Sequence, residues 1–352
     1  MTLREPAGTL WRMHREAIKR IARAPGGKGN VLLGGGAILA ARWAHRRSTT
    51  IEILLPERTA VYDVGRGGTV DLERATGGEV VQNDGWRIVL KVDEGKLDIA
   101  AMRPELPGLE ATAEVEGQAQ TVLGNEQILR GKLNRTDEGI ARDAFDFAVS
   151  RRVDPRALEI AANSFSEDAN RVLQRNLRAG NGDMGREAEA ELEDVAPEYE
   201  ECRQALGELG ADAVAASRYK EVRIAVRQGR IHIATQAVAG TIRSETYDGR
   251  RPAEALQKTG MDAYLESNSN ELPGGVALEL EERARNGRDG TVLRASRSNG
   301  IRRARTRPAS RGTTARKSNR HQPAADTKAG TGSRAAENTG RERARGEAGE
   351  PR

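Results

Sequence analysis

A run of three glycines between an apolar strand and a helix constrains the fold of this chain more than any other feature of its sequence. Residues 31–33 are apolar and typical of a strand, residues 34–36 are all glycine, and residues 37–46 are rich in helix formers. Residues 49–55 contain β-branched side chains and an alternating face, which predicts a second strand. A glycine turn of this kind can cradle phosphate groups, because its amides are accessible and a helix N-terminus favours anions. A plain tight connection between strand and helix fits the same residues, so both interpretations stay open.

The elements around this turn predict a sheet flanked by helices. An amphipathic helix is expected at residues 10–24, before the glycines. Residue types and alternation then predict strands at residues 80–81, 86–92 and 96–101. Apolar residues at three- and four-residue spacing predict helices at residues 126–134 and 138–150. Residues 93–95 are typical of a hairpin turn. Together these elements predict an α+β domain with a mostly contiguous sheet at residues 1–150.

The rest of the chain divides into a mainly helical region and a tail. Residues 155–217 have predominantly helical character, and residues 252–265 predict a further short helix. Residues 221–237 alternate apolar and polar side chains around Gln228 and Gly229, which predicts a β-hairpin. We therefore expect a mainly helical region with one hairpin at residues 151–290, followed by a basic tail at residues 291–352.

Charge separates the tail from the body of the chain. Residues 291–352 contain 16 Lys and Arg against 5 Asp and Glu, a net charge of +11, so the chain's +5 leaves residues 1–290 at −6. The tail has few large aliphatic residues and cannot bury enough surface to offset its ordering entropy, so we expect it to be disordered. An arginine-rich tail either contacts RNA or is a solvated extension, and both interpretations stay open. The mildly acidic body argues against an extended groove for nucleic acid.

Composition excludes several kinds of site. The single cysteine, Cys202, excludes an internal disulfide and a multi-cysteine metal site. The four histidines lie far apart without ligand-like spacing, which argues against histidine-bound zinc. No apolar run approaches the ~18 residues that cross a bilayer, and the N-terminal residues lack the apolar core of a signal peptide. We therefore expect a soluble, cytoplasmic protein with no membrane partner.

The stretch from Leu33 to Leu54 resembles the opening motif of the AbiEii nucleotidyltransferases. In that motif, paired glycines lead into a helix, followed by His-Arg, a serine and an acidic pair on the next strand. The matching residues in this sequence are Gly35, Gly36, His45, Arg46, Ser48, Thr50 and Glu52. The resemblance implies a nucleotidyltransferase-like mixed sheet flanked by helices. It also implies the toxin of a type IV toxin-antitoxin pair, which transfers a nucleotide from a nucleoside triphosphate to a transfer RNA or protein and has a cognate antitoxin.

The acidic pair departs from the family's pattern of two aspartates, one residue apart on one face of the strand. Thr50 stands at the first position and Glu52 at the second. Threonine is neutral, so a site for two Mg²⁺ ions loses one negative charge, and activity is left open. Asp98, on the strand predicted at residues 96–101, is the best candidate for a replacement carboxylate. Asp93 is a weaker candidate, and Asp98 is equally compatible with an exposed acid at a strand end.

A second stretch, from Glu126 to Ala148, is similar to the family's later motif, in which a helix with a lysine precedes Arg-Asp-x-x-Asp. The resemblance implies that Lys132 contacts triphosphate oxygens and that Asp143 is an active-site acid, which orients Lys132 or accepts a proton. Arg142 and Asp146 complete the match. A salt-bridged surface helix fits the same residues. His45 is interpreted either as a site residue or as a histidine packed at a helix end.

Three hypotheses follow for the function. The first is an active nucleotidyltransferase with the predicted catalytic residues Glu52, Asp98 and Asp143, nucleotide-binding residues Gly35, Gly36, Ser48 and Lys132, and Mg²⁺ ligands Glu52 and Asp98. The second is a degenerate relative that binds a nucleotide with little or no turnover, because Thr50 removes a metal ligand. The third is an RNA-binding protein without enzymatic activity that uses the arginine-rich tail.

Overall fold

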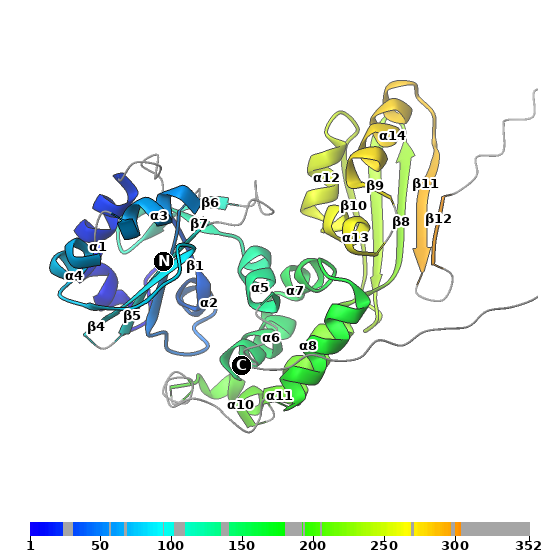
Figure 1. Cartoon of the computed structure of the whole chain (residues 1–352). Coiled ribbons are helices and arrows are strands. Elements are labelled where there is room, and N and C mark those ends of the chain that lie inside the picture. The colour runs from blue at the N-terminus through cyan, green and yellow to red at the C-terminus, as the bar shows by residue number, and fades with distance from the viewer. Residues whose placement is uncertain are drawn as a thin grey trace, which may run out of the picture. The chain divides into compact units, whose positions relative to one another are not determined.

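The computed structural model describes most of the first 303 residues (Figure 1). The described residues are 1–23, 31–55, 58–66, 69–93, 95–101, 110–134, 141–179, 192, 194–204, 206–268, 271–296 and 300–303. The part of the expected tail from residue 304 onward lies outside them. No helix in the described residues is long and apolar enough to cross a membrane.

A seven-stranded mixed sheet, with the strand order β3-β4-β5-β2-β1-β7-β6, forms the N-terminal part. Its strands are β1 (Leu32–Gly34), β2 (Thr50–Leu55), β3 (Glu79–Asn83), β4 (Arg87–Val92), β5 (Gly95–Ala101), β6 (Glu110–Val115) and β7 (Gln118–Leu123). Strand β2 pairs with β5 in parallel and with β1 in antiparallel orientation, and β1 pairs with β7 in parallel. The hairpin turn expected near residue 94 joins β4 to β5 and places Asp93 at a φ of 35°.

Helices pack against this sheet because its strands carry large apolar residues. Ile53, Leu55 and Ile99 are fully buried, in a core that also contains residues of the N-terminal helix. The helices of this part are α1 (Ala7–Arg23), α2 (Gly35–Trp43), α3 (Arg58–Arg66) and α4 (Thr69–Thr76). Helix α2 begins directly at the end of β1, so the expected order of strand, glycine turn, helix and strand is confirmed. The predicted α+β fold with a mixed sheet and flanking helices is also confirmed.

A group of helices follows the sheet, and its core is continuous with that of the sheet. The elements are α5 (Asn125–Leu133), α6 (Ala141–Val153), α7 (Pro155–Ala162), α8 (Glu167–Ala179), the 3₁₀ helix η2 (Pro197–Tyr199), α10 (Glu200–Gln204) and α11 (Leu206–Ser217). The expected domain boundary at residue 150 therefore falls inside α6. Helices α6 and α11 pack closely at Gly210, where an added Cβ would lie only 2.8 Å from the Cα of Ala144.

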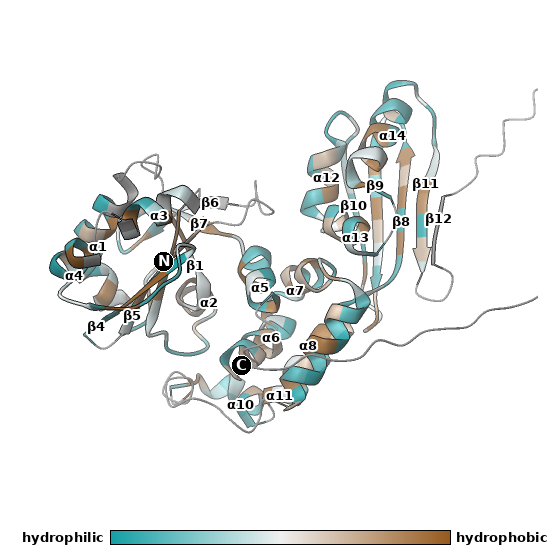
Figure 2. Cartoon of the chain, in the orientation of Figure 1, coloured by the Kyte–Doolittle hydropathy of each residue, from teal (hydrophilic) through white to brown (hydrophobic). Residues whose placement is uncertain are grey.

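A second, antiparallel sheet of five strands occupies residues 219–303, with the order β10-β9-β8-β11-β12. Its strands are β8 (Tyr219–Arg227), β9 (Arg230–Ala237), β10 (Ile242–Asp248), β11 (Gly290–Ser296) and β12 (Gly300–Arg303), and its helices are α12 (Pro252–Lys258), α13 (Met261–Asn268) and α14 (Pro273–Arg285). The predicted hairpin is confirmed, with Gln228 and Gly229 at positive φ in its turn. Hydrophobic residues are concentrated along β8 and β9 (Figure 2).

Strands β11 and β12 occupy residues that the sequence assigned to the tail. Val292, Leu293 and Ala295 are buried in the core of the second sheet, at 1–2% exposure. Strand β8 supplies the backbone partner that makes this burial possible. The expected boundary at residue 291 therefore does not describe where the folded part ends, because the apolar content of residues 291–303 is low but sufficient for strands added to an existing sheet.

Candidate functional site

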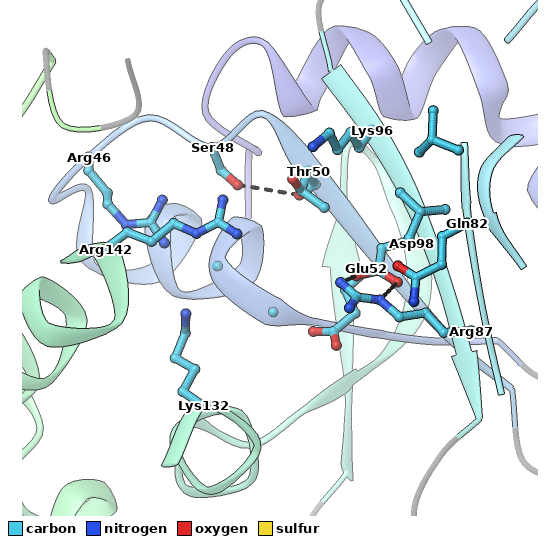
Figure 3. A pocket seen from close by; sticks show the side chains of 14 residues that line it. Arg46, Ser48, Thr50, Glu52, Gln82, Arg87, Lys96, Asp98, Lys132 and Arg142 are labelled. Atoms are coloured by element: carbon cyan, nitrogen blue, oxygen red, sulfur yellow. Dashed lines mark hydrogen bonds and ion pairs between the residues drawn. The ribbon is translucent and has the colours of Figure 1, made fainter. Parts of the chain in front are cut away.

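A cavity of about 210 Å³ lies beside β2, at the start of α2 (Figure 3). The residues that line it come from β2 to β5, from the segment around α2, and from α5 and α6. They are Gly35, Gly36, Arg46, Ser48, Thr50, Glu52, Val81, Gln82, Arg87, Val89, Lys96, Asp98, Lys132 and Arg142. Six of the seven predicted site residues are among them, and the seventh, Asp143, lies directly behind the lining and contacts Lys132.

The two predicted acidic residues lie side by side on neighbouring parallel strands. Glu52 on β2 is the register partner of Asp98 on β5, and Thr50 lies opposite Lys96 in the same way. Side chains two residues apart on a strand point to the same face, so Thr50 and Glu52 both face the cavity while Ile51 is buried on the other side. The parallel pairing of β2 with β5 therefore brings the two carboxylates together.

Asp98 is bound by an arginine that the sequence analysis did not single out. Arg87 on β4 donates from Nε to Oδ1 of Asp98 at 2.8 Å and from Nη2 to Oδ2 at 2.7 Å. The Asp98 side chain is 7% exposed and that of Arg87 is 34% exposed, so Arg87 is the more accessible partner of the pair, and both line the cavity. Both oxygens of Asp98 thus accept a hydrogen bond from one guanidinium, which is the strong bidentate geometry of an arginine–carboxylate pair.

The two glycines at the start of α2 make room for two charged side chains. A Cβ on Gly35 would lie 2.5 Å from Oε2 of Glu52, and Gly35 has a φ of +69°, which favours glycine. A Cβ on Gly36 would lie 2.5 Å from Nη2 of Arg46. Any side chain at either position would displace Glu52 or Arg46. The glycine pair therefore does more than connect a strand to a helix, since it lets an acid and a base approach the backbone at the cavity.

A buried ionic network lies on the other side of the cavity and is centred on Asp146 of α6. Arg46 donates to both carboxylate oxygens of Asp146, at 2.8 and 2.9 Å, and His45 Nε2 lies 2.7 Å from Oδ1. The ammonium group of Lys132 lies 2.9 Å from Oδ2 of Asp146 and also donates to Asp143. The side chains of Asp146 and His45 have no exposed surface. The network fixes Arg46 and Lys132, which both reach the cavity.

Charges within the network keep it ionised. Burial by itself raises the pKa of Asp146, but the charges of Arg46 and Lys132 and the hydrogen bonds from Arg46 and His45 outweigh this and hold its pKa well below the usual range. Burial lowers the pKa of His45, which favours the neutral ring. A neutral ring can donate its Nε2 hydrogen to Asp146, while Nδ1 is buried without a hydrogen-bond partner. His45 also stacks on Phe145, so it is a packed residue of the network that does not line the cavity.

The remaining predicted residues are placed as follows. Ser48 is buried and donates to the carbonyl oxygen of Thr50 at 3.3 Å, so it lines the cavity and steadies the start of β2. Asp93, the weaker candidate for a replacement carboxylate, lies at the β4–β5 turn, where its Oδ2 is 3.7 Å from His14 Nε2. It is not part of the cavity lining, so its position does not support that role.

The lining does not fit a site for two divalent cations. Such a site needs several carboxylates that converge on the ions. Among the described lining residues the carboxylates are Glu52 and Asp98, Asp98 is already bound bidentately by Arg87, and Thr50 is neutral. In the part of the chain that the structure describes, no group of three or more His, Cys, Asp or Glu residues is arranged to hold a metal ion.

The described lining is instead rich in cations. Five lining side chains are basic, namely Arg46, Arg87, Lys96, Lys132 and Arg142, against the two carboxylates. Figure 3 shows Arg46, Arg142 and Lys132 approaching the cavity from the side opposite Arg87, Glu52 and Asp98. Of these five residues, only Lys132 was predicted from the sequence to have a site role. The motifs contained Arg46 and Arg142, but nothing in the sequence around Arg87 or Lys96 indicates a site, because both reach the cavity only through strand pairing.

Comparisons with known proteins give a distant likeness to solved structures. No family model matches this chain and no curated protein matches it, so the resemblance to the AbiEii family stays a prediction. The antibiotic-resistance factor ANT(2'')-Ia in solution is 19% identical over 37% of this chain and 71% of that chain, with a TM-score of 0.28. Its crystal structure with adenylyl-2''-tobramycin gives 19% identity over 37% of this chain and 76% of that chain, with a TM-score of 0.26.

A third similar structure is an antigenic nucleotidyltransferase-like protein from Paracoccidioides brasiliensis. It is 16% identical over 51% of this chain and 94% of that chain, with a TM-score of 0.31. The solved structures that this chain resembles are thus a nucleotidyltransferase-like protein and an antibiotic-resistance factor. Similarity at this level carries no argument about activity, so the case for a function depends on this chain's own residues.

Proposed function

We propose that the cavity beside β2 binds a nucleoside triphosphate through its phosphate groups. The observation that carries this proposal is the lining itself, in which five basic side chains face the cavity at the start of α2. Phosphate oxygens carry several negative charges, and arginine forks and lysine ammonium groups are the side chains that pair with them best. The backbone at Gly35 and Gly36 adds the favourable end of a helix dipole to the same space.

Each cation has a defined support in this proposal. Lys132 is held by Asp143 and Asp146, and Arg46 by Asp146, so both charges are positioned before a ligand arrives. Preorganised charges avoid the cost of ordering long side chains upon binding. Arg142, at the start of α6, and Lys96, opposite Thr50, complete the ring. The acids Asp143 and Asp146 thus act by positioning Lys132 and Arg46 and make no direct contact with the nucleotide.

A binding titration with two neighbouring lysines tests this proposal. Lys96 lines the cavity, whereas Lys91, its register partner on β4, is exposed and outside the lining. Isothermal titration with ATP should show about tenfold weaker binding for Lys96→Gln, as expected for one lost charged contact, and an unchanged affinity for Lys91→Gln. Adenosine should bind much more weakly than ATP. Equal affinities for adenosine and ATP, or equal losses in the two variants, would contradict the proposal.

A second candidate function is nucleotide transfer, and the adjacency of Glu52 and Asp98 favours it. In this reaction an acceptor hydroxyl attacks the α-phosphate, a new P–O bond forms, and diphosphate leaves while the cations stabilise its developing charge. Glu52 lines the cavity on the strand beside Asp98, and we assign it to accept the hydroxyl proton. Incubation with each α-labelled nucleoside triphosphate and total transfer RNA or protein should label an acceptor with the wild-type chain and not with Glu52→Gln.

A more specific version of this second candidate is that the chain is the toxin of a toxin-antitoxin pair, and the motif resemblance supports it. Expression of an active toxin should stop bacterial growth, and co-expression of a neighbouring gene that encodes a cognate antitoxin should restore it. Glu52→Gln is the control, because it keeps the size of the side chain and removes its charge. Growth arrest by Glu52→Gln as strong as by the wild-type chain would contradict a toxic transferase activity and leave nucleotide binding untouched.

A further inference from the structure

We infer that Arg87 replaces a divalent cation in this cavity, so that the site binds a nucleoside triphosphate without Mg²⁺. The inference rests on the proposed binding function and goes beyond it, because it states how the charge of the phosphates is balanced. Two observations carry it, namely the bidentate pairing of Arg87 with Asp98 and the excess of basic residues in the lining.

The first observation is that the guanidinium of Arg87 lies beside the carboxylate of Asp98, in the place where a metal ion would bind. Glu52 and Asp98 are register partners on adjacent strands and line the same cavity, so their negative charges repel unless a cation lies beside them. The guanidinium of Arg87 supplies that charge, 2.7–2.8 Å from both oxygens of Asp98. A metal ion would need the same oxygens as ligands. Arg87 therefore competes with a divalent ion for the oxygens of Asp98, and its positive charge repels that ion.

The second observation concerns the charge that faces the phosphates. In a metal-dependent site, carboxylates recruit the metal and the metal carries positive charge to the phosphate oxygens. In this cavity the described lining has five basic side chains and two acidic ones, so positive charge is already in place. A nucleotide complexed with Mg²⁺ has less negative charge than the free form. A lining with more basic than acidic side chains, in which Arg87 holds Asp98, therefore favours the free form.

The position of Arg87 suits a replacement that contacts the ligand. Its side chain lines the cavity and is 34% exposed, whereas that of Asp98 is 7% exposed, so Arg87 is the partner more accessible to a ligand. Arginine keeps its charge at every physiological pH and presents several N–H donors, so one guanidinium can bind a carboxylate along one edge and face a phosphate. Lysine at this position would supply charge without the fork.

Calorimetry of ATP binding, in EDTA and in excess Mg²⁺, tests this inference in the full chain. The wild-type protein should bind ATP at least as tightly in EDTA as in Mg²⁺. Arg87→Gln should weaken binding in EDTA by about tenfold, the equivalent of one charged contact, and Mg²⁺ should restore part of the loss because Asp98 is released as a ligand. The control is Arg178→Gln in α8, which removes the exposed 2.7 Å pair of Arg178 with Asp212 and does not change the cavity lining. This variant should leave both affinities unchanged.

A second measurement uses a metal ion alone and does not depend on nucleotide. Titration with Mn²⁺, followed by its electron paramagnetic resonance signal, should give no tight binding to the wild-type protein and a new site in Arg87→Gln. The double variant Arg87→Gln with Asp98→Asn should lose that site again. Circular dichroism checks that each variant is folded, and Arg87→Lys provides a more conservative change if Arg87→Gln is not.

The outcomes separate this inference from the proposed function. ATP binding by the wild-type protein only in the presence of Mg²⁺, or tight Mn²⁺ binding by the wild-type protein, would overturn the inference and leave nucleotide binding standing. Absence of ATP binding under both conditions would overturn the proposed function and the inference with it. Binding in EDTA that depends on Arg87 and not on Arg178 would support both.

Discussion

Two aspartates beside the cavity are each bound bidentately by an arginine, yet their surroundings differ. Asp146 and Arg46 are 0% and 1% exposed and share their ionic network with His45 and Lys132, whereas Arg87, the partner of Asp98, is 34% exposed. An arginine–aspartate pair therefore has a different role in each of these two surroundings. The closed network joins the segment after α2 to α5 and α6, and the open pair places a guanidinium at the mouth of the cavity.

The difference in burial predicts a difference in energy. Removing one partner of a buried ion pair leaves the other charges without compensation in a medium of low polarity, which costs much more than the pair contributes. Removing a partner of an exposed pair leaves a charge that water can solvate. The network around Asp146 should therefore control stability, and the pair of Arg87 with Asp98 should control binding.

The largest expected effect comes from Asp146→Ala. This change leaves Arg46 and Lys132 buried without their shared carboxylate and should lower the free energy of unfolding by about 3–5 kcal/mol. Urea denaturation followed by circular dichroism measures it. The matched control is Asp212→Ala, which breaks the exposed pair with Arg178 and should cost less than about 1 kcal/mol. Similar losses in the two variants would show that burial does not distinguish the pairs.

The next largest effect is expected from Gly35→Ala, which disturbs the acidic side of the cavity. The new Cβ would lie 2.5 Å from Oε2 of Glu52 at a φ of +69°, so both the side chain and the backbone must shift, at a cost of about 1–3 kcal/mol. Gly131→Ala is the control, because Gly131 lies within α5 with nothing within 4 Å of its added Cβ. It should leave stability unchanged or raise it by up to about 1 kcal/mol. A gain in stability from Gly35→Ala would contradict the close contact with Glu52.

A smaller effect is expected from pH, and it sharpens the account of the buried network. Burial lowers the pKa of His45 from 6.5, so the unfolded chain takes up a proton near pH 6.5 that the folded chain does not, and stability should decline as the pH falls below that value. The lowered pKa of Asp146 adds a second contribution, a stabilisation that is complete above the unfolded value near 3.8 and is lost as the pH falls from there toward the folded pKa.

Thermal unfolding between pH 8 and pH 5 measures the contribution of the histidine. His45→Gln should reduce the decline of the melting temperature over this range, while the contribution of His14, whose pKa burial also lowers, remains. A melting temperature of the wild-type protein that rises as the pH falls from 7 to 5 would contradict a neutral His45 in the folded state.

Local patterns predicted β1, α2 and β2, whereas the hairpin of β6 and β7 was not predicted. The alternation in residues 49–55 and the glycines before α2 depend on neighbours in sequence, and both elements form where they were expected. The second sheet was predicted only in part. The hairpin of β8 and β9 has a local turn signal at Gln228 and Gly229, whereas β11 becomes a strand because β8 lies beside it, and no pattern within residues 290–296 contains that information.

The candidate site divides in the same way. Gly35, Glu52 and Lys132 were selected from motifs and they line one cavity. The partner of Asp98 was not predicted, although the hairpin of β4 and β5 was, because Arg87 lies diagonally across that hairpin from Asp98 and no motif marks it as a site residue. The motif resemblance suggested a metal site, and the pairing of Asp98 with Arg87 indicates a cavity that uses its own cations.

The most direct test of this account is a crystal structure of the protein grown with a non-hydrolysable ATP analogue in the presence of EDTA. The account predicts phosphate density among Gly35, Lys132 and Arg87, with the pair of Arg87 and Asp98 intact. A nucleotide bound elsewhere on the chain would contradict it. So would a structure with Mg²⁺ added in which a metal ion bridges Glu52 and Asp98 and Arg87 has moved away.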